Sequence, residues 1–439
     1  MLEGGKDMSI NLRCIEQKKD AKGRIEYYVL QDKRNEKYHV TPAELRQRMR
    51  SHYYFVENMA LSEKGRLRVV SYRMAKKVYH WNKYHIMHGN RKVASIHKNG
   101  TCKIYAKKLM PYNLYLEQAS EDDIDTCIQN LDNFYHWCAS RVLTLDREYA
   151  KEILNSIGAS QSATDKDRAQ VALSYHCLSL MDIYWTKESY ERQDFTTLNL
   201  FQNHLASAFV DVSLRGKQMT IENSHLIADD LATQGCYPKA WIRREDGFYL
   251  MKDGGIEPVE QELLASKICR CFLFNQVKYE EEFYDGQKVS VSKIVTSLAY
   301  SIVPMEYFEV YCINHEIDKM QYLLNLDAYS YYMMNIMDYL IGNTDRHWGN
   351  WGLLVDNETN KPVRLYDLMD FNKAFQAYDT VEGVNCLTAP NKMSQKEAAI
   401  EAVQKIGLNQ ISEVDYKWFS DNSQREMFID RLEILKKKI

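Results

Sequence analysis

The N-terminal part of the chain alternates hydrophobic and polar residues at the spacing of short β-strands. Residues 25–30 (IEYYVL) and 37–40 (KYHV) follow this pattern, and 94–108 (ASIHKNGTCKIYAKK) holds two such runs around the dipeptide Asn99-Gly100. An Asn-Gly pair between two strand-like runs is a strong signal for a β-hairpin. The first hundred residues therefore predict a unit built largely from short strands.

Helical patterns accompany these strands. Residues 41–50 (TPAELRQRMR) begin with a capping box and place a proline at the first helical position. A longer helix is predicted after the capping residues Ser120 and Asp123, because apolar side chains then recur every three or four residues. These positions are Ile124, Cys127, Ile128, Leu131, Phe134, Tyr135, Cys138 and Val142. Strands and helices together predict a small α+β domain at residues 1–155.

A polar stretch rich in small residues follows this domain. In residues 156–167 (SIGASQSATDKD) the helical pattern dissolves into residue types that are typical of loops and linkers. We take this stretch as the boundary between the N-terminal domain, residues 1–155, and a second domain at residues 168–439.

The second domain contains a strand-strand-helix pattern and a long buried helix. Residues 239–245 (KAWIRRE) and 247–255 (GFYLMKDGG) predict two strands joined by a turn, and 259–272 (VEQELLASKICRCF) predicts an amphipathic helix. Residues 326–341 (LDAYSYYMMNIMDYLI) predict a further helix that stops at Gly342. The segment after Gly342 is therefore expected to form a loop that follows a buried helix.

A hairpin and helices complete the predicted second domain. Residues 351–372 hold two strand-like runs around a polar turn, and the second arm is expected to end at Asp370. Nearer the C-terminus, Ser394 and Glu397 predict a capping box for a helix that Gly407 closes. The C-terminal end is therefore predicted to be helical.

Composition narrows the class of protein. With 439 residues and 45% hydrophobic content, the chain is long enough for two or three domains with their own cores, which excludes a disordered protein. No run approaches the roughly 18 apolar residues of a membrane span, and the first residues lack the apolar core of a signal peptide. We therefore expect a cytoplasmic protein without a membrane partner. The ten cysteines form no CxxC pair, so neither a zinc site nor a disulfide framework is predicted.

Positive charge is concentrated in one segment. Residues 64–98 hold ten Lys or Arg and no Asp or Glu, although the whole chain has a net charge of −3. A solvated basic face is the first interpretation, an acidic partner protein the second, and nucleic acid the third. His80, His85 and His88 lie in this segment, but without a nearby cysteine or carboxylate they do not predict a metal site.

The predicted loop carries a spacing that is typical of phosphoryl transfer. In residues 342–350 (GNTDRHWGN), Asn350 follows Asp345 by five positions. In protein kinases a metal-binding asparagine follows the catalytic aspartate at this spacing, and a hairpin separates that loop from a metal-binding aspartate. Here the predicted hairpin leads to Asp370. Turn formation is the alternative role for Asp345, and His347 either takes part in catalysis or braces the loop by hydrogen bonding.

A lysine and a glutamate upstream complete the set of residue types. Kinases position the nucleotide phosphates with a strand lysine that a helix glutamate holds in place. Lys252 ends the second predicted strand, and Glu262 lies in the helix that follows. Taken singly, each is more often a solvated surface residue. Their order relative to Asp345, Asn350 and Asp370 is the order found in kinases.

These residues resemble a known family. Residues 343–350 (NTDRHWGN), followed by a hairpin and an acidic strand end, resemble the HipA-like serine/threonine kinases, whose fold is related to that of the phosphoinositide kinases. The resemblance covers roughly residues 170–439. It includes 179–185 (SLMDIYW), 235–242 (GCYPKAWI) and 261–268 (QELLASKI). It implies an α+β, two-lobed protein-kinase-like fold preceded by the small α+β domain. The N-lobe would span about residues 205–310 and a mostly helical C-lobe about 311–439.

The resemblance also implies roles for the loop and hairpin residues. Asp345 would be the catalytic base, with His347 beside it in the catalytic loop. Asn350 and Asp370 would be the Mg²⁺ ligands. Asp367 is the alternative metal ligand, because it could end the same arm of the hairpin as Asp370.

For nucleotide binding, the resemblance points to the strand-strand-helix unit. Lys252 would position the ATP phosphates and Glu262 would hold Lys252. The segment that contains Gly235 is similar to the family's glycine-containing nucleotide loop. Because Gly235 is the only glycine in that segment, Lys239 is a further candidate phosphate contact.

Three functions follow as hypotheses. The first is an ATP- and Mg²⁺-dependent kinase that phosphorylates Ser or Thr of a protein, with the N-terminal domain choosing or restraining the substrate and an antitoxin-like or regulatory partner possible. The second keeps the fold and phosphorylates a small molecule or lipid head group, because fold does not fix the substrate. The third is a nucleotide-binding regulatory module that docks on nucleic acid or an acidic protein.

Overall fold

The structure is a computed structural model, which describes residues 13–22, 24–31, 35–41, 59–61, 67–69, 83–141, 165–174, 176–203, 238–376 and 378–439. The chain divides into two compact units, which we describe separately. The first comprises Met1–Ser140, Arg168–Cys177 and Tyr184–Leu198, and the second comprises Arg141–Asp167, Leu178–Ile183 and Asn199–Ile439. Most of the predicted boundary stretch lies outside the described residues, and the division into domains 1–155 and 168–439 stays a prediction.

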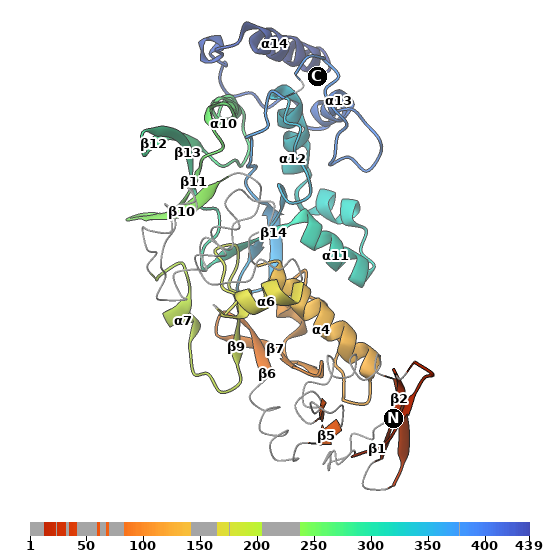
Figure 1. The fold of residues 1–439 in the computed structure, drawn as a ribbon. Helices are drawn as coiled ribbons and strands as arrows, with labels where there is room; N and C mark the ends of the chain where they lie inside the picture. Colours follow the sequence, from red (N-terminus) through yellow and green to blue (C-terminus); the bar gives the residue numbers. More distant parts are fainter. Residues whose placement is uncertain are drawn as a thin grey trace. The chain divides into compact units, whose positions relative to one another are not determined.

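The first unit is built on a four-stranded antiparallel sheet and one long helix (Figure 1). The sheet has the order β8-β7-β6-β9, and the helix is α4. Their bounds are Lys83–His88 for β6, Arg91–His97 for β7, Cys102–Ile104 for β8, Tyr184–Glu188 for β9 and Ile124–Ala139 for α4. The side chain of Asp123 accepts a hydrogen bond from the Thr126 amide and so caps α4, as predicted.

The Asn99-Gly100 turn between β7 and β8 confirms the predicted hairpin. Asn99 Oδ1 accepts hydrogen bonds from the backbone nitrogen and the hydroxyl of Thr101, at 3.1 and 2.9 Å. Gly100 has a φ of +88°, and a Cβ atom there would lie 2.0 Å from the carbonyl oxygen of Cys127 in α4. Only glycine fits, because both the backbone conformation and the closeness of the helix exclude a side chain.

Shorter elements complete the first unit and the connection to the second. The predicted strands at 25–30 and 37–40 are confirmed as β2 and β3 of a three-stranded antiparallel sheet. The predicted helix at 41–50 lies, apart from Thr41, outside the described residues. The bounds are Arg13–Lys19 for β1, Ile25–Gln31 for β2, Lys37–Val40 for β3, Met59–Leu61 for β4, Leu67–Val69 for β5, Lys107–Leu109 for η1, Asp165–Ser174 for α6 and Phe195–Leu198 for α7.

The second unit contains a four-stranded antiparallel sheet of order β10-β11-β13-β12, against which α10 packs. The predicted strand-strand-helix pattern is confirmed as β10, β11 and α10. The bounds are Lys239–Arg244 for β10, Gly247–Lys252 for β11, Ile256–Cys269 for α10, Tyr279–Tyr284 for β12 and Gln287–Lys293 for β13. Alternate side chains of this sheet, namely Ala240, Met251, Val289 and Val291, form a buried apolar cluster.

A three-stranded antiparallel sheet of order β14-β15-β16 and several helices make up the rest of the second unit (Figure 1). The bounds are Tyr300–Pro304 for β14, Met305–His315 for α11, Lys319–Leu340 for α12, Gly352–Asp356 for β15, Lys361–Leu365 for β16, Gln395–Ile406 for α13, Tyr416–Trp418 for η3 and Asn422–Lys436 for α14. The capping box of Ser394 and Glu397 begins α13, and Gly407 ends it, as predicted. In the described part of the chain, no helix combines the length and apolar character that a membrane crossing requires.

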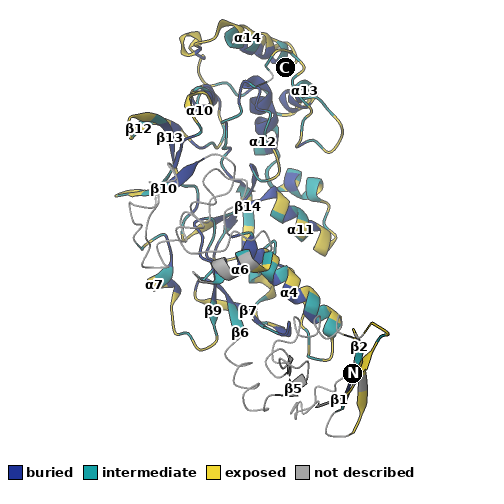
Figure 2. Cartoon of the chain, viewed as in Figure 1, coloured by how far each residue is buried: buried dark blue, intermediate teal, exposed yellow. Residues whose placement is uncertain are grey.

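The long helix α12 places the loop that follows it. Its second half is buried, as Figure 2 shows, and includes the run from Met333 to Leu340. At Asp327 the backbone leaves the helical conformation, and the Asp327 side chain accepts hydrogen bonds from the backbone nitrogens of Ser330 and Leu365. The helix is therefore fixed to β16 at its kink and to the core along its second half.

The second arm of the predicted hairpin ends earlier than expected. The strand β16 ends at Leu365, so the expected end at Asp370 is wrong by five residues. The backbone leaves the ladder because Leu368 pairs with residues 275–277 instead. The backbone nitrogen of Leu368 donates to the carbonyl oxygen of Asn275 at 3.0 Å, and its carbonyl oxygen accepts from the backbone nitrogen of Val277 at 2.9 Å. Asp370 therefore lies on an irregular segment that is held against residues 275–277, the connection between α10 and β12.

Candidate active site

A buried ion cluster forms where β11, α10 and the segment after β16 meet. Lys252 Nζ lies 2.7 Å from Glu262 Oε1 and 2.8 Å from Asp370 Oδ1. Lys252 and Glu262 are 6% and 1% exposed, whereas 21% of the Asp370 side chain is exposed. Ser290 on β13 donates to the second carboxylate oxygen of Glu262 at 2.5 Å. Glu262 is thus satisfied on both oxygens, and Asp370 is the member of the cluster that faces outward.

The charges of this cluster stabilise one another. Burial lowers the pKa of Lys252, but the carboxylates of Asp370 and Glu262 outweigh burial and hold that pKa well above its usual value. Burial raises the pKa of Asp370, but Lys252, Lys239 and then Arg346 hold it well below its usual range. At neutral pH Lys252 is therefore an ammonium group and Asp370 a carboxylate.

Tyr279, at the start of β12, fixes the backbone of Asp370. The backbone nitrogen of Asp370 donates a hydrogen bond of 3.0 Å to the Tyr279 hydroxyl. Asp370 has a φ of +63°, a left-handed conformation that is uncommon for residues other than glycine. The Tyr279 ring is 3% exposed, and Lys252 Nζ lies 5.0 Å from its centroid. Tyr279 therefore holds Asp370 in a conformation that aims its carboxylate at Lys252.

A second lysine lies beside this cluster. Lys239 on β10 is the cross-strand partner of Lys252 on β11, so both side chains project from the same face of the sheet. Lys239 is 8% exposed, and its charge lowers the pKa of Asp370. The structure thus brings Lys239, Lys252, Glu262 and Asp370 together. Gly235, the glycine of the predicted nucleotide loop, lies outside the described residues.

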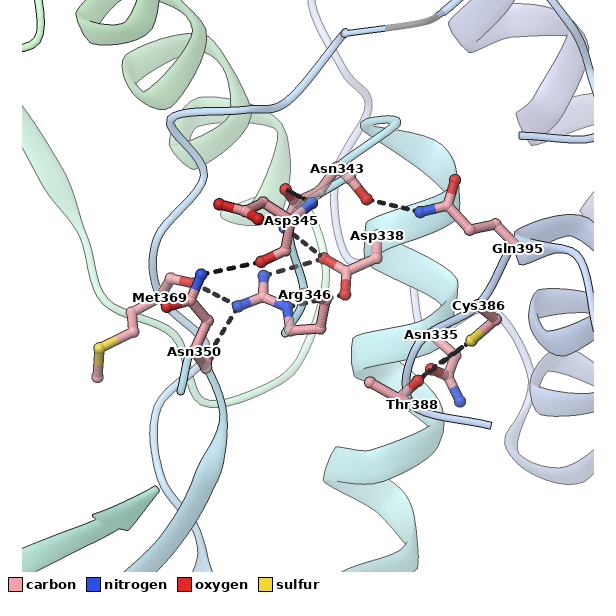
Figure 3. Close-up of polar contacts among 10 residues, drawn as sticks. All are labelled: Asn335, Asp338, Asn343, Asp345, Arg346, Asn350, Met369, Cys386, Thr388 and Gln395. Carbon is pink, nitrogen blue, oxygen red and sulfur yellow. Dashed lines mark hydrogen bonds and ion pairs between the residues drawn. The ribbon is translucent and has the colours of Figure 1, made fainter. Parts of the chain in front are cut away.

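Arg346 organises the loop after α12, as Figure 3 shows. Its guanidinium donates to both carboxylate oxygens of Asp338 at 2.9 Å. It also donates to the carbonyl oxygens of Asn350 and Met369, at 2.8 and 2.6 Å. Arg346 is 3% exposed, and it ties α12, the loop and the residue before Asp370 into one structure. The loop that carries Asp345 is therefore held next to Asp370.

Hydrogen bonds within the loop position Asn350, the predicted Mg²⁺ ligand, and Asp345, the predicted catalytic base. Asn350 Nδ2 donates to the carbonyl oxygen of Asp345 at 2.9 Å, which leaves Asn350 Oδ1 as the oxygen that a cation could take. The backbone nitrogen of Asp345 donates to Asn343 Oδ1 at 3.3 Å (Figure 3). The Asp345 carboxylate itself is 30% exposed and lies 3.0 Å from Lys373 Nζ. It is thus the accessible acid of the loop.

His347 and Asp367 lie in different settings. His347 Nδ1 accepts a hydrogen bond of 3.0 Å from the backbone nitrogen of Gly349, and a Cβ atom on Gly349 would come within 2.8 Å of the His347 ring. The ring therefore braces the loop by this hydrogen bond, and its predicted part in catalysis stays a prediction. Asp367 forms an ion pair of 2.7 Å with Arg364, a residue of β16. Asp370 lies instead in the Lys252 cluster.

Three residues of this site were not found from the sequence. Tyr279 begins a strand in which three glutamates follow it, a pattern that does not single out the tyrosine, and its contact to Asp370 spans 91 positions. Lys373 lies three residues after Asp370, and this place in the sequence was the available signal. Asp338 was visible only as a polar residue within an apolar helix pattern, and burial beside Arg346 explains it.

Asn350 and Asp370 fit a particular kind of metal ion. Among the described residues, no group of three or more His, Cys, Asp or Glu side chains could hold a metal. An amide oxygen and one carboxylate suit Mg²⁺, which commonly takes one or two protein oxygens together with water and substrate phosphates. The donor set is therefore one that a nucleotide would complete.

Comparisons with known proteins found distant structural likenesses. No protein-family model matches the sequence, and no curated protein matches it. The chain is similar to the Helicobacter pylori proinflammatory kinase CtkA, with 16% identity and a TM-score of 0.37, over 47% of this chain and 89% of that one. It is also similar to HipA of Shewanella oneidensis MR-1, solved as a toxin-antitoxin complex with HipB and operator DNA. That likeness has 10% identity and a TM-score of 0.47, over 81% of this chain and 88% of that one. The chain's own residues therefore carry the functional assignment.

Proposed function

We propose that the chain is an ATP- and Mg²⁺-dependent kinase that transfers the γ-phosphate to a Ser or Thr hydroxyl of a protein. The observation that carries the proposal is the buried contact of Lys252 with Glu262 and Asp370. A lysine that must hold phosphates needs a glutamate partner, and it needs the metal-binding carboxylate within reach. Both conditions are met by residues from three separate parts of the second unit.

The basic side of the site would hold the nucleotide. Lys252 and Lys239 project from one face of the sheet and would contact phosphate oxygens, while Glu262 keeps Lys252 in place. Asn350 and Asp370 would hold Mg²⁺, which when bound neutralises charge on the phosphates. Arg346 keeps these two ligands in register, because it contacts the carbonyl oxygens of Asn350 and Met369.

The acceptor side of the site would be formed by Asp345. Its carboxylate, partly exposed, would accept a hydrogen bond from the attacking hydroxyl and take its proton. His347 would act by bracing the loop that presents Asp345. Holding donor and acceptor in line supplies much of the rate enhancement in reactions of this kind, so the rigid support of the loop is part of the chemistry.

The proposal includes a two-lobed arrangement of the second unit. The sheet β10–β13 with α10 would belong to an N-lobe at about residues 205–310, and α11 to α14 to a C-lobe at about 311–439. Residues 1–155 would choose or restrain the substrate, and the proposal includes an antitoxin-like or regulatory partner.

A labelled-phosphate assay tests the function and its acceptor class together. Purified chain is incubated with γ-labelled ATP and Mg²⁺, and the products are resolved by gel and by thin-layer chromatography. Label on a protein that disappears with EDTA and with Asp345→Asn supports the proposal. Label on a small molecule or lipid would instead assign a kinase with another acceptor. ATP binding without any transfer would favour a nucleotide-binding module.

A further inference from the structure

A second charged pair marks the accessible edge of the candidate site. Lys373 Nζ lies 3.0 Å from Asp345 Oδ2, and the two side chains are 34% and 30% exposed. The position of Lys373 is fixed by its surroundings, because Phe371 and Ala374 beside it are fully buried. The backbone nitrogen of Thr344 also donates to the carbonyl oxygen of Lys373 at 3.4 Å. The turn that carries Lys373 is therefore held against the Asp345 loop.

Three other basic side chains near this loop, among the described residues, already have structural tasks. Arg346 is committed to Asp338 and to two backbone carbonyl oxygens. His347 uses Nδ1 to accept the Gly349 amide, and Lys252 lies in the buried cluster with Glu262. A transferred phosphoryl group spreads negative charge over three oxygens in the transition state, and a positive side chain near those oxygens stabilises that charge.

Stability does not account for the Lys373–Asp345 pair. Ion pairs between partly exposed side chains typically contribute about 0.2–1 kcal/mol, because water competes and long side chains lose entropy. A lysine has three donors on a flexible stem, so it can contact a carboxylate and a phosphate oxygen at the same time. Such a residue suits a site where one partner is present throughout and the other arrives with the substrate.

We propose that Lys373 is a further catalytic residue that bridges Asp345 and the γ-phosphate of bound ATP. During transfer Asp345 takes the proton of the acceptor hydroxyl, and the acceptor oxygen forms the new bond to the γ-phosphorus. The bond from the γ-phosphorus to the β,γ-bridging oxygen breaks, and ADP leaves with that electron pair. Lys373 balances the charge on the moving phosphoryl oxygens and keeps Asp345 turned toward the acceptor. This inference rests on the proposed kinase function.

Nucleotide affinities separate this role from a structural one. A residue that contacts the γ-phosphate strengthens the binding of ATP and leaves ADP binding unchanged. We expect Lys373→Met to lower Mg·ATP affinity by about tenfold relative to Mg·ADP in calorimetry, and to lower kcat by about 10²-fold, the range for losing one transition-state contact. Lys373→Arg, which keeps the charge, should recover most of both.

Lys396→Met is the matched control, because Lys396 forms an ion pair of 2.8 Å with Glu382 and has a similarly exposed side chain. It should leave both affinities and kcat unchanged. If Lys373→Met keeps kcat and the ATP-to-ADP preference, or weakens both nucleotides equally, the proposed role of Lys373 is wrong while the kinase function stands. A wild-type chain that neither binds Mg·ATP nor transfers phosphate contradicts the kinase function and this inference together.

Discussion

Asp345 and Arg346 are neighbours in the sequence but lie in opposite environments. The Arg346 side chain is 4% exposed and pairs with Asp338, itself 7% exposed. The Asp345 side chain is 30% exposed and forms an ion pair of 3.0 Å with Lys373. Water competes for such a partly exposed pair and weakens it. Arg346 faces the core below the loop, and Asp345 faces the open edge of the site.

In the proposed mechanism, this difference separates support from chemistry within one loop. The buried half consists of charge-assisted hydrogen bonds that join α12, the loop and the segment of Asp370, and it has no exposed reactive group. The open half presents a carboxylate and an ammonium group to solvent. A rigid support beneath an accessible carboxylate is the arrangement that a positioned general base requires. Substitutions in the two halves should therefore have different consequences.

The largest effect is expected from Asp345→Asn on turnover. The amide keeps the size of the side chain but cannot take the acceptor proton, so kcat should fall by about 10²–10⁴-fold. The free energy of unfolding should change by less than about 1 kcal/mol, because the pair with Lys373 is partly exposed. Turnover and urea denaturation of the same preparation measure both quantities, and unchanged turnover would remove Asp345 from the role of base.

Arg346→Met should act in the opposite way, through stability. Removing one partner of a buried ion pair leaves the charge of Asp338 uncompensated, which costs about 3–5 kcal/mol of unfolding free energy. Denaturant unfolding measures this loss. The double variant Asp338→Asn with Arg346→Met should recover part of it, since the buried charge is then gone. A single variant as stable as the wild type would show that the buried half of the loop does not support the fold.

The third prediction compares two aspartates on either side of the support. Asp370→Asn should weaken Mg²⁺-dependent ATP binding at least about tenfold. Even residues that only support metal ligands typically change metal affinity by about that factor when they are mutated. Asp367→Asn should change that affinity little, because Asp367 pairs with Arg364 and lies outside the Lys252 cluster. Calorimetry with and without Mg²⁺ gives the order directly. The reverse order would assign the metal to Asp367.

Tyr279→Phe should have the smallest effect on nucleotide binding. The Asp370 amide loses its acceptor, which costs about 1–3 kcal/mol when the group stays unpaired, and Mg·ATP should bind more weakly. Tyr331→Phe is the matched control, because Tyr331 is 4% exposed and donates its hydroxyl to the Thr388 carbonyl oxygen, at 3.1 Å. It should lower stability similarly and leave nucleotide binding intact. Equal nucleotide affinities in the two variants would mean that Tyr279 does not position Asp370.

Local patterns in the sequence predicted many elements of the fold. The Asn99-Gly100 hairpin, the helix capped by Asp123 and the capping box of Ser394 and Glu397 were all predicted and are present. Each depends on hydrogen bonds between residues a few positions apart, so the sequence contains the whole interaction. The predicted end of the hairpin at Asp370 was wrong, because residues near Leu368 pair with a distant segment.

The sequence by itself determined which residue types occur and where they stand on their elements. It placed Lys252 at the end of a strand, Glu262 in the following helix, and Asp345 five positions before Asn350 in a loop. These placements follow from periodicity and turn chemistry, which act over a few residues.

Only the tertiary structure decided how these residues meet. The contact of Lys252 with Asp370 spans 118 positions, and the hydrogen bond of Tyr279 to Asp370 spans 91. Such contacts depend on how the sheets and α12 pack, because packing selects which polar side chains are buried together and must satisfy one another. For the same reason Asp345 and Arg346, adjacent in the chain, became an accessible acid and a buried support.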